Sequence, residues 1–322
     1  MGSRPRVVIT GGWLHRYAVL CALATFLLII AGGLVTSTDS GLAVPDWPLS
    51  YGMLFPPMVG GIFYEHGHRM IAGAVGLMTL ALTIWVWRRE ERPWVRRLAV
   101  TALVTVVIQA VLGGITVLWL LPPAVSSIHL GTAMAFFCMV TALALVTSKG
   151  WHAVDRAAIP SPSVLPSLAL ATSLAAYVQI LLGATMRHTG AGLACPDFPL
   201  CNGALVPNLS APGIALHMSH RIGAVVVTAL VLYLVGRAWA LHPEVPEFRR
   251  PALAALAFVG LQILLGTLSV LSGLAIYITT AHVAGGALLL CSLVVLTLRA
   301  YRRLGVLDTA EHSVAAPTSA AA

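Results

Sequence analysis

The chain has 322 residues, of which 58% are hydrophobic and only 9% are charged, and its mean hydropathy is +0.90. Soluble domains carry roughly 25% charged residues, so this composition excludes an ordinary soluble domain. Repeated apolar runs indicate an all-α polytopic membrane protein. The net charge of +8 is also typical of nucleic-acid-binding proteins, but the positions of the charges explain it better, and we expect no nucleic-acid partner.

Eight apolar segments follow one another along the chain, and each is long enough to cross a bilayer as a helix. They cover residues 17–36, 63–87, 98–120, 125–147, 165–187, 213–236, 251–272 and 276–298. Of the 19 basic residues, 16 fall on the five segments of one side: Arg4, Arg6, Arg16, Arg88, Arg89, Arg92, Arg96, Arg97, Lys149, Arg156, Arg237, Arg249, Arg250, Arg299, Arg302 and Arg303. The positive-inside rule therefore predicts that both termini lie in the cytoplasm, and we expect a bacterial plasma (inner) membrane.

Three stretches of the chain return about 150 residues later, which indicates a tandem duplication. "GLAVPDWPLSYG" (Gly41–Gly52) returns as "GLACPDFPLCNG" (Gly192–Gly203), "GHRMIAGAV" from Gly67 as "SHRIGAVVV" from Ser219, and "QAVLGGITVL" from Gln109 as "QILLGTLSVL" from Gln262. Each copy holds four spans and so keeps its orientation. The sequence predicts two tandem four-helix bundles related by a pseudo-two-fold axis along the membrane normal.

The duplication also predicts the domain organisation. A cytoplasmic N-terminus (1–16) precedes the first four-helix unit (17–147), and a cytoplasmic linker (148–164) leads to the second unit (165–298). The last segment (299–322) is a cytoplasmic tail, and its composition after Gly305 is typical of a disordered end.

Four of the 11 histidines occupy equivalent positions in the two copies: His68 and His129 in the first, His220 and His282 in the second. At 1.5 Å per residue, His129 lies roughly 7–8 Å into its helix, and the others are at a comparable depth. Zinc usually takes three or four protein ligands, whereas haem iron needs only axial ligands from facing bundle helices. The sequence therefore predicts two haem sites, one in each unit.

Residues beside these histidines have a structural and a functional interpretation. One set of glycines leaves room for a flat macrocycle: Gly67, Gly131, Gly223 and Gly285. Another set is interpreted as ordinary helix packing: Gly113, Gly114 and Gly266. Arg69 and Arg221 directly follow a candidate ligand. Their guanidinium groups either hold haem propionates or extend to the outer interface, and the sequence favours neither role.

The two copies differ at one ionisable position. Glu65 lies three residues before His68 on the same helix face, and His217 holds the corresponding place before His220. An ionisable group at membrane depth is a functional candidate, so Glu65 is predicted to transfer protons. The structural alternative is a surface glutamate paired with Arg69. His66 is assigned no role.

The cysteines differ as well. Cys195 and Cys201 bracket "PDFPL" in the second outer loop, where the first loop has Val44 and Ser50. Outside the cytoplasm a disulfide between them would persist, and a structural bridge is favoured over a redox-active one. Three cysteines within spans are interpreted as small apolar side chains: Cys21, Cys138 and Cys291.

Six motifs in order carry a resemblance over nearly the whole chain: "GGLVTSTDSGLAVPDWPLSYG", "EHGHRMIAG", "SSIHLGTAM", "GLACPDFPLC", "HMSHRIGAV" and "TTAHVAGGA". Together they resemble the haem A synthase family. The resemblance implies an eight-helix oxidoreductase that oxidises the C8 methyl group of haem O to a formyl group, giving haem A for cytochrome oxidase. It also implies haem O synthase and oxidase assembly factors as partners, within a lipid membrane, with homo-oligomers as a further option.

The resemblance also assigns the sites. His68 and His129 would handle the substrate haem with Glu65 as a catalytic residue, and His220 and His282 would be the axial ligands of a permanent haem b that relays electrons. Many bacterial relatives have a cysteine pair in the first outer loop, which this chain lacks. A mechanism that needs those thiols is therefore in doubt here.

Three other functions fit part of the pattern. A dihaem b-type cytochrome linked to quinol would explain the histidines but gives Glu65 no task. A repeat-built transporter would place charges near the midplane, which the spans almost entirely lack. A prenyltransferase would need aspartate-rich motifs, and the sequence has none.

Overall fold

The computed structural model describes residues 12–152 and 163–304, and within these ranges the chain is helical, with two isolated β-bridges in place of strands. The long helices are α1 (Trp13–Ser37), α2 (Gly60–Arg89), α3 (Pro93–Leu118), α4 (Pro123–Val146), α6 (Leu165–His188), α7 (Pro212–Leu241), α8 (Pro246–Leu271) and α9 (Ile276–Arg303). Two short ones are α5 (Lys149–His152) and the 3₁₀ turn η1 (Ala191–Leu193). All eight long helices are long and apolar enough to cross a membrane, which confirms the predicted fold class.

Prolines and left-handed residues delimit these helices. Proline occupies the first turn of five of them, α3, α4, α6, α7 and α8, where its missing N–H has no helical partner to lose. Between α3 and α4, Leu120 and Leu121 both adopt positive φ angles of 59° and 58°, and Pro122 follows. This tight reversal makes α3 and α4 an antiparallel hairpin, as the short connection predicts.

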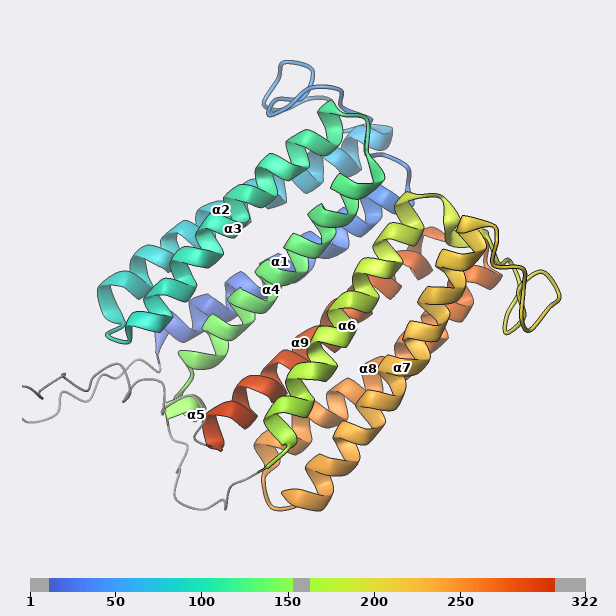
Figure 1. Ribbon diagram of the computed structural model, residues 1–322. Coiled ribbons are helices and arrows are strands. Elements are labelled where there is room, and N and C mark those ends of the chain that lie inside the picture. The colour runs from blue at the N-terminus through green and yellow to red at the C-terminus, as the bar shows by residue number, and fades with distance from the viewer. Residues whose placement is uncertain (1–11, 153–162, 305–322) are drawn as a thin grey trace, which may run out of the picture.

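The helices form two groups of four (Figure 1). In the first group, α1 contacts α2 and α4, and α3 contacts α2 and α4; in the second, α6 contacts α7 and α9, and α8 contacts α7 and α9. The groups meet through α1 against α9 and α4 against α6 and α9. The pseudo-two-fold axis stays a prediction, and so do the domain boundaries, whose terminal and linker segments fall partly on residues 1–11, 153–162 and 305–322, outside the described residues.

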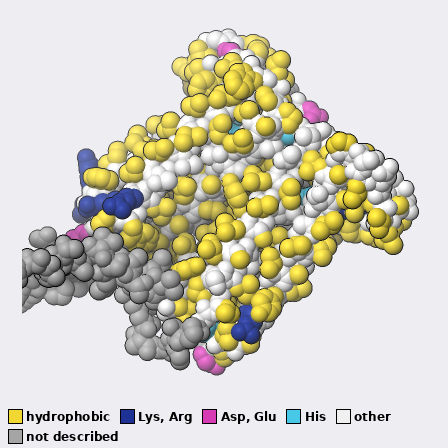
Figure 2. Space-filling model, viewed as in Figure 1, with side chains coloured by type: hydrophobic (Ala, Val, Ile, Leu, Met, Phe, Trp, Pro, Cys, Tyr) yellow, Lys and Arg dark blue, Asp and Glu magenta, His cyan; other side chains and the backbone are white. Residues whose placement is uncertain are grey.

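The two ends of the molecule differ in charge. The end carrying the long connections 38–59 and 189–211 is called the loop end, and the opposite end carries the basic residues predicted to lie in the cytoplasm. In Figure 2 hydrophobic side chains cover most of the visible surface, basic groups gather at the arginine-rich end, and histidines show among the helices nearer the loop end. This distribution is that of a protein surrounded by lipid.

Candidate haem sites

The four predicted ligands lie near the loop end on four different helices. His68 is on α2, His129 on α4, His220 on α7 and His282 on α9, and each is partly accessible although the helices surround it. His68 and His129 are close enough to interact electrostatically, as are His220 and His282. The structure therefore brings the histidines together as one pair in each half.

A glycine on the preceding helix faces each imidazole. A Cβ added at Gly32 would lie 3.1 Å from Cε1 of His68, and at Gly113 the distance to Cε1 of His129 would be 3.2 Å. In the second half the corresponding distances are 2.8 Å from Gly183 to His220 and 3.2 Å from Gly266 to His282. These glycines make room for the rings, so they fix where each histidine lies.

Two of these glycines correct the sequence interpretation. The sequence favours ordinary packing for Gly113 and Gly266, yet both face a predicted ligand histidine. Conversely, a Cβ at Gly131 would meet Leu181 and Tyr177 of α6. At Gly223 and Gly285 it would overlap Gln179 and Gln262, because those positions accommodate glutamine side chains. Only Gly67 has a nearly open surrounding, with Met58 Cε at 3.9 Å.

Glu65 is buried at the junction of α2 and the first outer loop. Its side chain is an acceptor on both oxygens: Oε2 accepts the Val44 N–H at 2.8 Å, and Oε1 is paired with Arg69. Each carboxylate oxygen has a second lone pair, so both can accept a further hydrogen bond. In the second half His217 is also buried, and its Nδ1 lies 3.1 Å from the carbonyl of Ala191. The carboxylate is therefore particular to the first half.

Both arginines next to the ligands contact the outer loops. Arg69 donates to the carbonyls of Val44, Asp46 and Leu49 at 2.7–3.2 Å. Arg221 repeats the arrangement with the carbonyls of Cys195, Asp197 and Leu200 at 2.7–3.1 Å, together with a longer bond to Pro199 at 3.4 Å. Their hydrogen bonds thus hold each loop against its helix, and their role toward propionates stays a prediction.

The loops are closed by different bonds in the two halves. Cys195 and Cys201 form a disulfide in the second loop. In the first loop Ser50 stands in the place of Cys201, and its Oγ lies 2.8 Å from Nδ1 of His66, a buried residue without a predicted role. This hydrogen bond ties the first loop to α2, so the absence of a cysteine pair does not leave that loop unattached.

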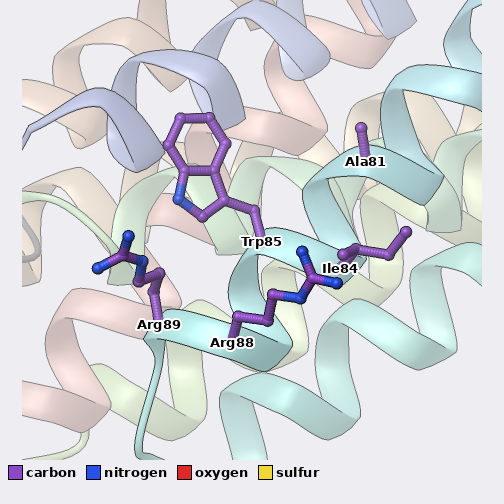
Figure 3. A pocket seen from close by; sticks show the side chains of 5 residues that line it. All are labelled: Ala81, Ile84, Trp85, Arg88 and Arg89. Carbon is purple, nitrogen blue, oxygen red and sulfur yellow. The ribbon is translucent and has the colours of Figure 1, made fainter.

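A shallow pocket lies elsewhere, at the arginine-rich end of α2 (Figure 3). Its lining residues are Ala81, Ile84, Trp85, Arg88 and Arg89. More than three helical turns separate it from His68 along α2, so it is not part of the histidine sites.

The donor set fits haem better than a bare metal ion. Among the described residues no three histidines, cysteines or carboxylates come together, so the available ligand sets are pairs of imidazoles. Nδ1 of His68, His129 and His282 is buried without a hydrogen bond of normal geometry, although the Leu28 carbonyl approaches the His68 ring. Two facing imidazoles are what an axially ligated haem requires.

Sequence reasoning missed His188 and the glutamines. His188 ends α6 and interacts electrostatically with His129 from the other half. Gln109 Nε2 donates to the His129 carbonyl at 2.8 Å, and Gln179 Nε2 contacts His220. The glutamines had a signal in the sequence, since "QILLG" occurs at both Gln179 and Gln262. His188 had none, because only packing of the two halves brings it near.

Comparisons with known proteins identify the family of this chain. The COX15-CtaA family, described as cytochrome oxidase assembly protein, matches residues 15–294. The haem A synthase of Symbiobacterium thermophilum is 34% identical over 75% of this chain and 80% of its own length. That of Shouchella clausii is 32% identical over 69% and 74%, and that of Geobacillus kaustophilus 30% identical over 94% and 97%. The chain belongs to the COX15-CtaA family of cytochrome oxidase assembly proteins.

Proposed function

We propose that the protein is a haem A synthase, an oxidoreductase that converts the C8 methyl group of haem O to a formyl group. Relatives of that name align with most of the chain. The observation that carries the proposal is the pair of imidazoles in each half, each ring against a glycine, with a buried carboxylate in the first half alone. A cytochrome that only passes electrons would not need that carboxylate.

The two pairs have different roles in this proposal. His68 and His129 would hold the substrate haem O beside Glu65, and His220 and His282 would hold a resident haem b. When bound, haem b would supply one-electron redox chemistry and relay the electrons that the methyl group loses to an external acceptor. The four histidines lie near the loop end of the bundle and would orient both haems there.

Glu65 is the proton acceptor of the first site. Oxidation of a methyl carbon releases protons, and a base must be placed within hydrogen-bonding reach to receive them. Arg69 and the Val44 N–H hold the carboxylate in one position, three residues from His68 on the same face of α2. Because Arg69 also holds the loop, the base and the loop that covers it are fixed together.

The location and partners follow from the same proposal. The eight helices make this a multi-pass membrane protein, and the arginine-rich end is assigned to the cytoplasm. Haem O is the substrate, so haem O synthase and oxidase assembly factors remain the expected partners, together with a possible homo-oligomer.

The test is made in a bacterium that makes haem O but lacks its own haem A synthase. Expression of this chain should produce extractable haem A, and Glu65→Gln should lower its amount at least a hundredfold because general base catalysis is worth about 10²–10⁴. Total bound haem should stay unchanged. The matched control is Glu91→Gln, an exposed glutamate at the other end of α2, which should be neutral.

Two results would contradict the proposal in different ways. Wild-type haem A yield from Glu65→Gln would reject the base role. Haem b alone from the wild-type protein, in cells that contain haem O, would favour the dihaem electron-transfer cytochrome instead.

A further inference from the structure

A five-residue pattern recurs on the helix that precedes each ligand helix. It reads "QAVLG" from Gln109 on α3, "QILLG" from Gln179 on α6 and "QILLG" from Gln262 on α8. On α1 the same register reads "LIIAG" from Leu28, with leucine in place of glutamine. In all four, the closing glycine is the one that faces a ligand imidazole. Each ligand therefore belongs to a helical hairpin of one design.

The glutamine lies one turn from that glycine, on the same helix face. Gln179 Nε2 is 2.7 Å from the His220 carbonyl and 3.0 Å from His220 Nδ1. Gln109 Nε2 is 2.8 Å from the His129 carbonyl. Both glutamines have an Oε1 that is buried without a partner. Each amide thus holds the ligand helix and keeps an acceptor free in the site.

Gln262 occupies the corresponding place near His282 with its amide turned. Its Nε2 would be 2.3 Å from a Cβ on Gly285, where Gln179 instead directs Oε1 at Gly223. Both glycines lie three residues after a ligand histidine. Since the two ends of an amide exchange places by a half-turn, Gln262 can offer the same donor to the His282 backbone as Gln179 offers to His220.

The first hairpin lacks this arrangement. Leu28 cannot form a side-chain hydrogen bond, and α2 has Ile71 at the position where α7 has Gly223. An apolar pair thus replaces the glutamine and the glycine that accommodates it. Among the four histidines, His68 is the one with no side-chain amide beside it.

An outer partner restrains a ligating histidine. When Nε2 binds iron, Nδ1 carries the proton, and the groups hydrogen-bonded to the ligand residue fix its orientation. Gln179 and Gln109 do this by donating to the carbonyl of the ligand residue. Removal of such a partner typically weakens metal binding about 10–100-fold. A resident haem must stay bound, whereas a substrate haem must enter and its product must leave.

We infer that Gln179, Gln109 and Gln262 are positioning residues for the haem ligands, and that Leu28 leaves His68 as the releasable ligand through which the first site exchanges its haem. The inference about exchange rests on the proposed function. The positioning role of Gln179 toward the second site does not, because it applies to any haem held by His220 and His282.

The first experiment replaces Gln179 by leucine, the residue of the α1 hairpin. The protein is purified from a host that makes only haem b, at no more than one haem per chain, and the ferrous haem is exposed to carbon monoxide. A bis-histidine haem is unreactive until a ligand leaves. Gln179→Leu should raise the carbon monoxide-reactive fraction at least tenfold, and Ser167→Ala, at the far end of the same helix, should leave it unchanged.

A conservative variant separates positioning from packing. Gln179→Glu keeps the length of the side chain and places an oxygen where Nε2 lies 3.0 Å from His220 Nδ1. It should stay unreactive to carbon monoxide, with a lower haem midpoint potential because a carboxylate that accepts from Nδ1 makes the ligand more basic. The positioning role is overturned if two results occur together. The carbon monoxide-reactive fraction of Gln179→Leu equals that of the wild type, and the haem midpoint potential of Gln179→Glu equals that of the wild type. If Gln179→Leu does not accumulate, Gln262→Leu is measured, with the same outcomes.

The converse experiment gives the first hairpin the glutamine and glycine of the second. In cells that supply haem O, Leu28→Gln/Ile71→Gly should retain several-fold more haem O and haem A per haem b through purification than the wild type. Unchanged retention overturns the role of Leu28. The proposed function is contradicted by a different result, namely that the wild type makes no haem A. That result would not affect the test of Gln179 with carbon monoxide.

Discussion

Each of the three arginines at the loop end is hydrogen-bonded to main-chain carbonyls. Arg69 and Arg221 donate hydrogen bonds to carbonyls of the outer loops of their own halves. Arg187 of α6 donates to the Thr36 carbonyl of α1 at 3.0 Å and forms an ion pair with Asp39 at 3.5 Å. The planar guanidinium group suits several carbonyls at once, which lysine cannot match. These exceptions to the positive-inside pattern are therefore structural positions that organise the outer surface.

The outer loops also contain matched aspartates. Asp46 accepts the N–H groups of Tyr51 and Gly52 at 2.7 and 2.8 Å, and Asp197 accepts those of Asn202 and Gly203 at the same distances. Hydrogen bonds to the charged form, led by the one from Gly52 for Asp46 and the one from Gly203 for Asp197, hold the pKa of each carboxyl below its usual value.

The lowered pKa of Asp46 predicts a pH dependence. A carboxyl whose pKa is lower in the folded state stabilises the loop above the unfolded pKa of about 4, and this contribution is lost as the pH falls through the folded value. The first loop should therefore stay closed at neutral pH and open only below about pH 4. Fluorescence of the exposed loop residue Trp47 against pH, corrected with Trp47→Phe, measures this transition. A transition retained in Asp46→Asn would contradict the assignment.

Glycine positions determine how the helices present their ligands. On α8, a Cβ at Gly266 would be 3.2 Å from His282 Cε1, whereas at Gly260 no other described group lies within 4 Å. The same helix thus contains one glycine that the site requires and one that it does not.

Gly266→Ala should therefore displace the His282 ring and lower the haem b content of the purified protein several-fold. Gly260→Ala should keep it, since alanine is favoured over glycine in a helix by about 1 kcal/mol. Haem per chain, from the pyridine haemochrome spectrum, distinguishes them. Equal haem content in both variants would reject a spatial role for Gly266.

The elements and the pairing of the four histidines were predictable from the sequence, but the rotation of the helices was not. Apolar runs mark all eight spans, and the duplication singles out His68, His129, His220 and His282. The helix ends differ by a few residues because the helices extend at the arginine-rich end, as α9 does to Arg303. Which glycine faces a ring depends on helix rotation, and in lipid an apolar residue fits either a helix interface or the membrane face.

The contacts of the first loop were also beyond the sequence. The pairing of Ser50 with His66 joins residues whose roles become visible only when the loop folds back onto α2. The same holds for Arg69, which the sequence placed near a ligand but whose hydrogen bonds go to loop carbonyls.

The two halves join through small and hydroxyl-bearing residues. Ser37 of α1 lies 3.0 Å from Thr279 and 3.2 Å from Thr280 of α9, hydroxyl to hydroxyl. Tyr177 of α6 donates to the Gly131 carbonyl of α4 at 3.1 Å. Such residues let helices approach closely where lipid offers no hydrophobic drive for association. In the proposed function, this contact would keep the two sites at the fixed distance that electron transfer between the halves requires.

Gly33 tests that contact, because a Cβ there would already lie 3.3 Å from Cγ2 of Thr280. Gly33→Leu should push α1 from α9 at a cost of about 1–3 kcal/mol. The temperature at which the purified protein loses its haem b spectrum should fall, and Gly73→Leu, at an open position of α2, should leave it unchanged. Thr280→Ala removes Cγ2, the nearest of the atoms that the leucine meets, so the double variant should recover part of the loss. If Thr280→Ala gives no recovery, the strain does not arise at the contact between α1 and α9. The leucine would then act within its own half, through the neighbouring Gly32 and His68.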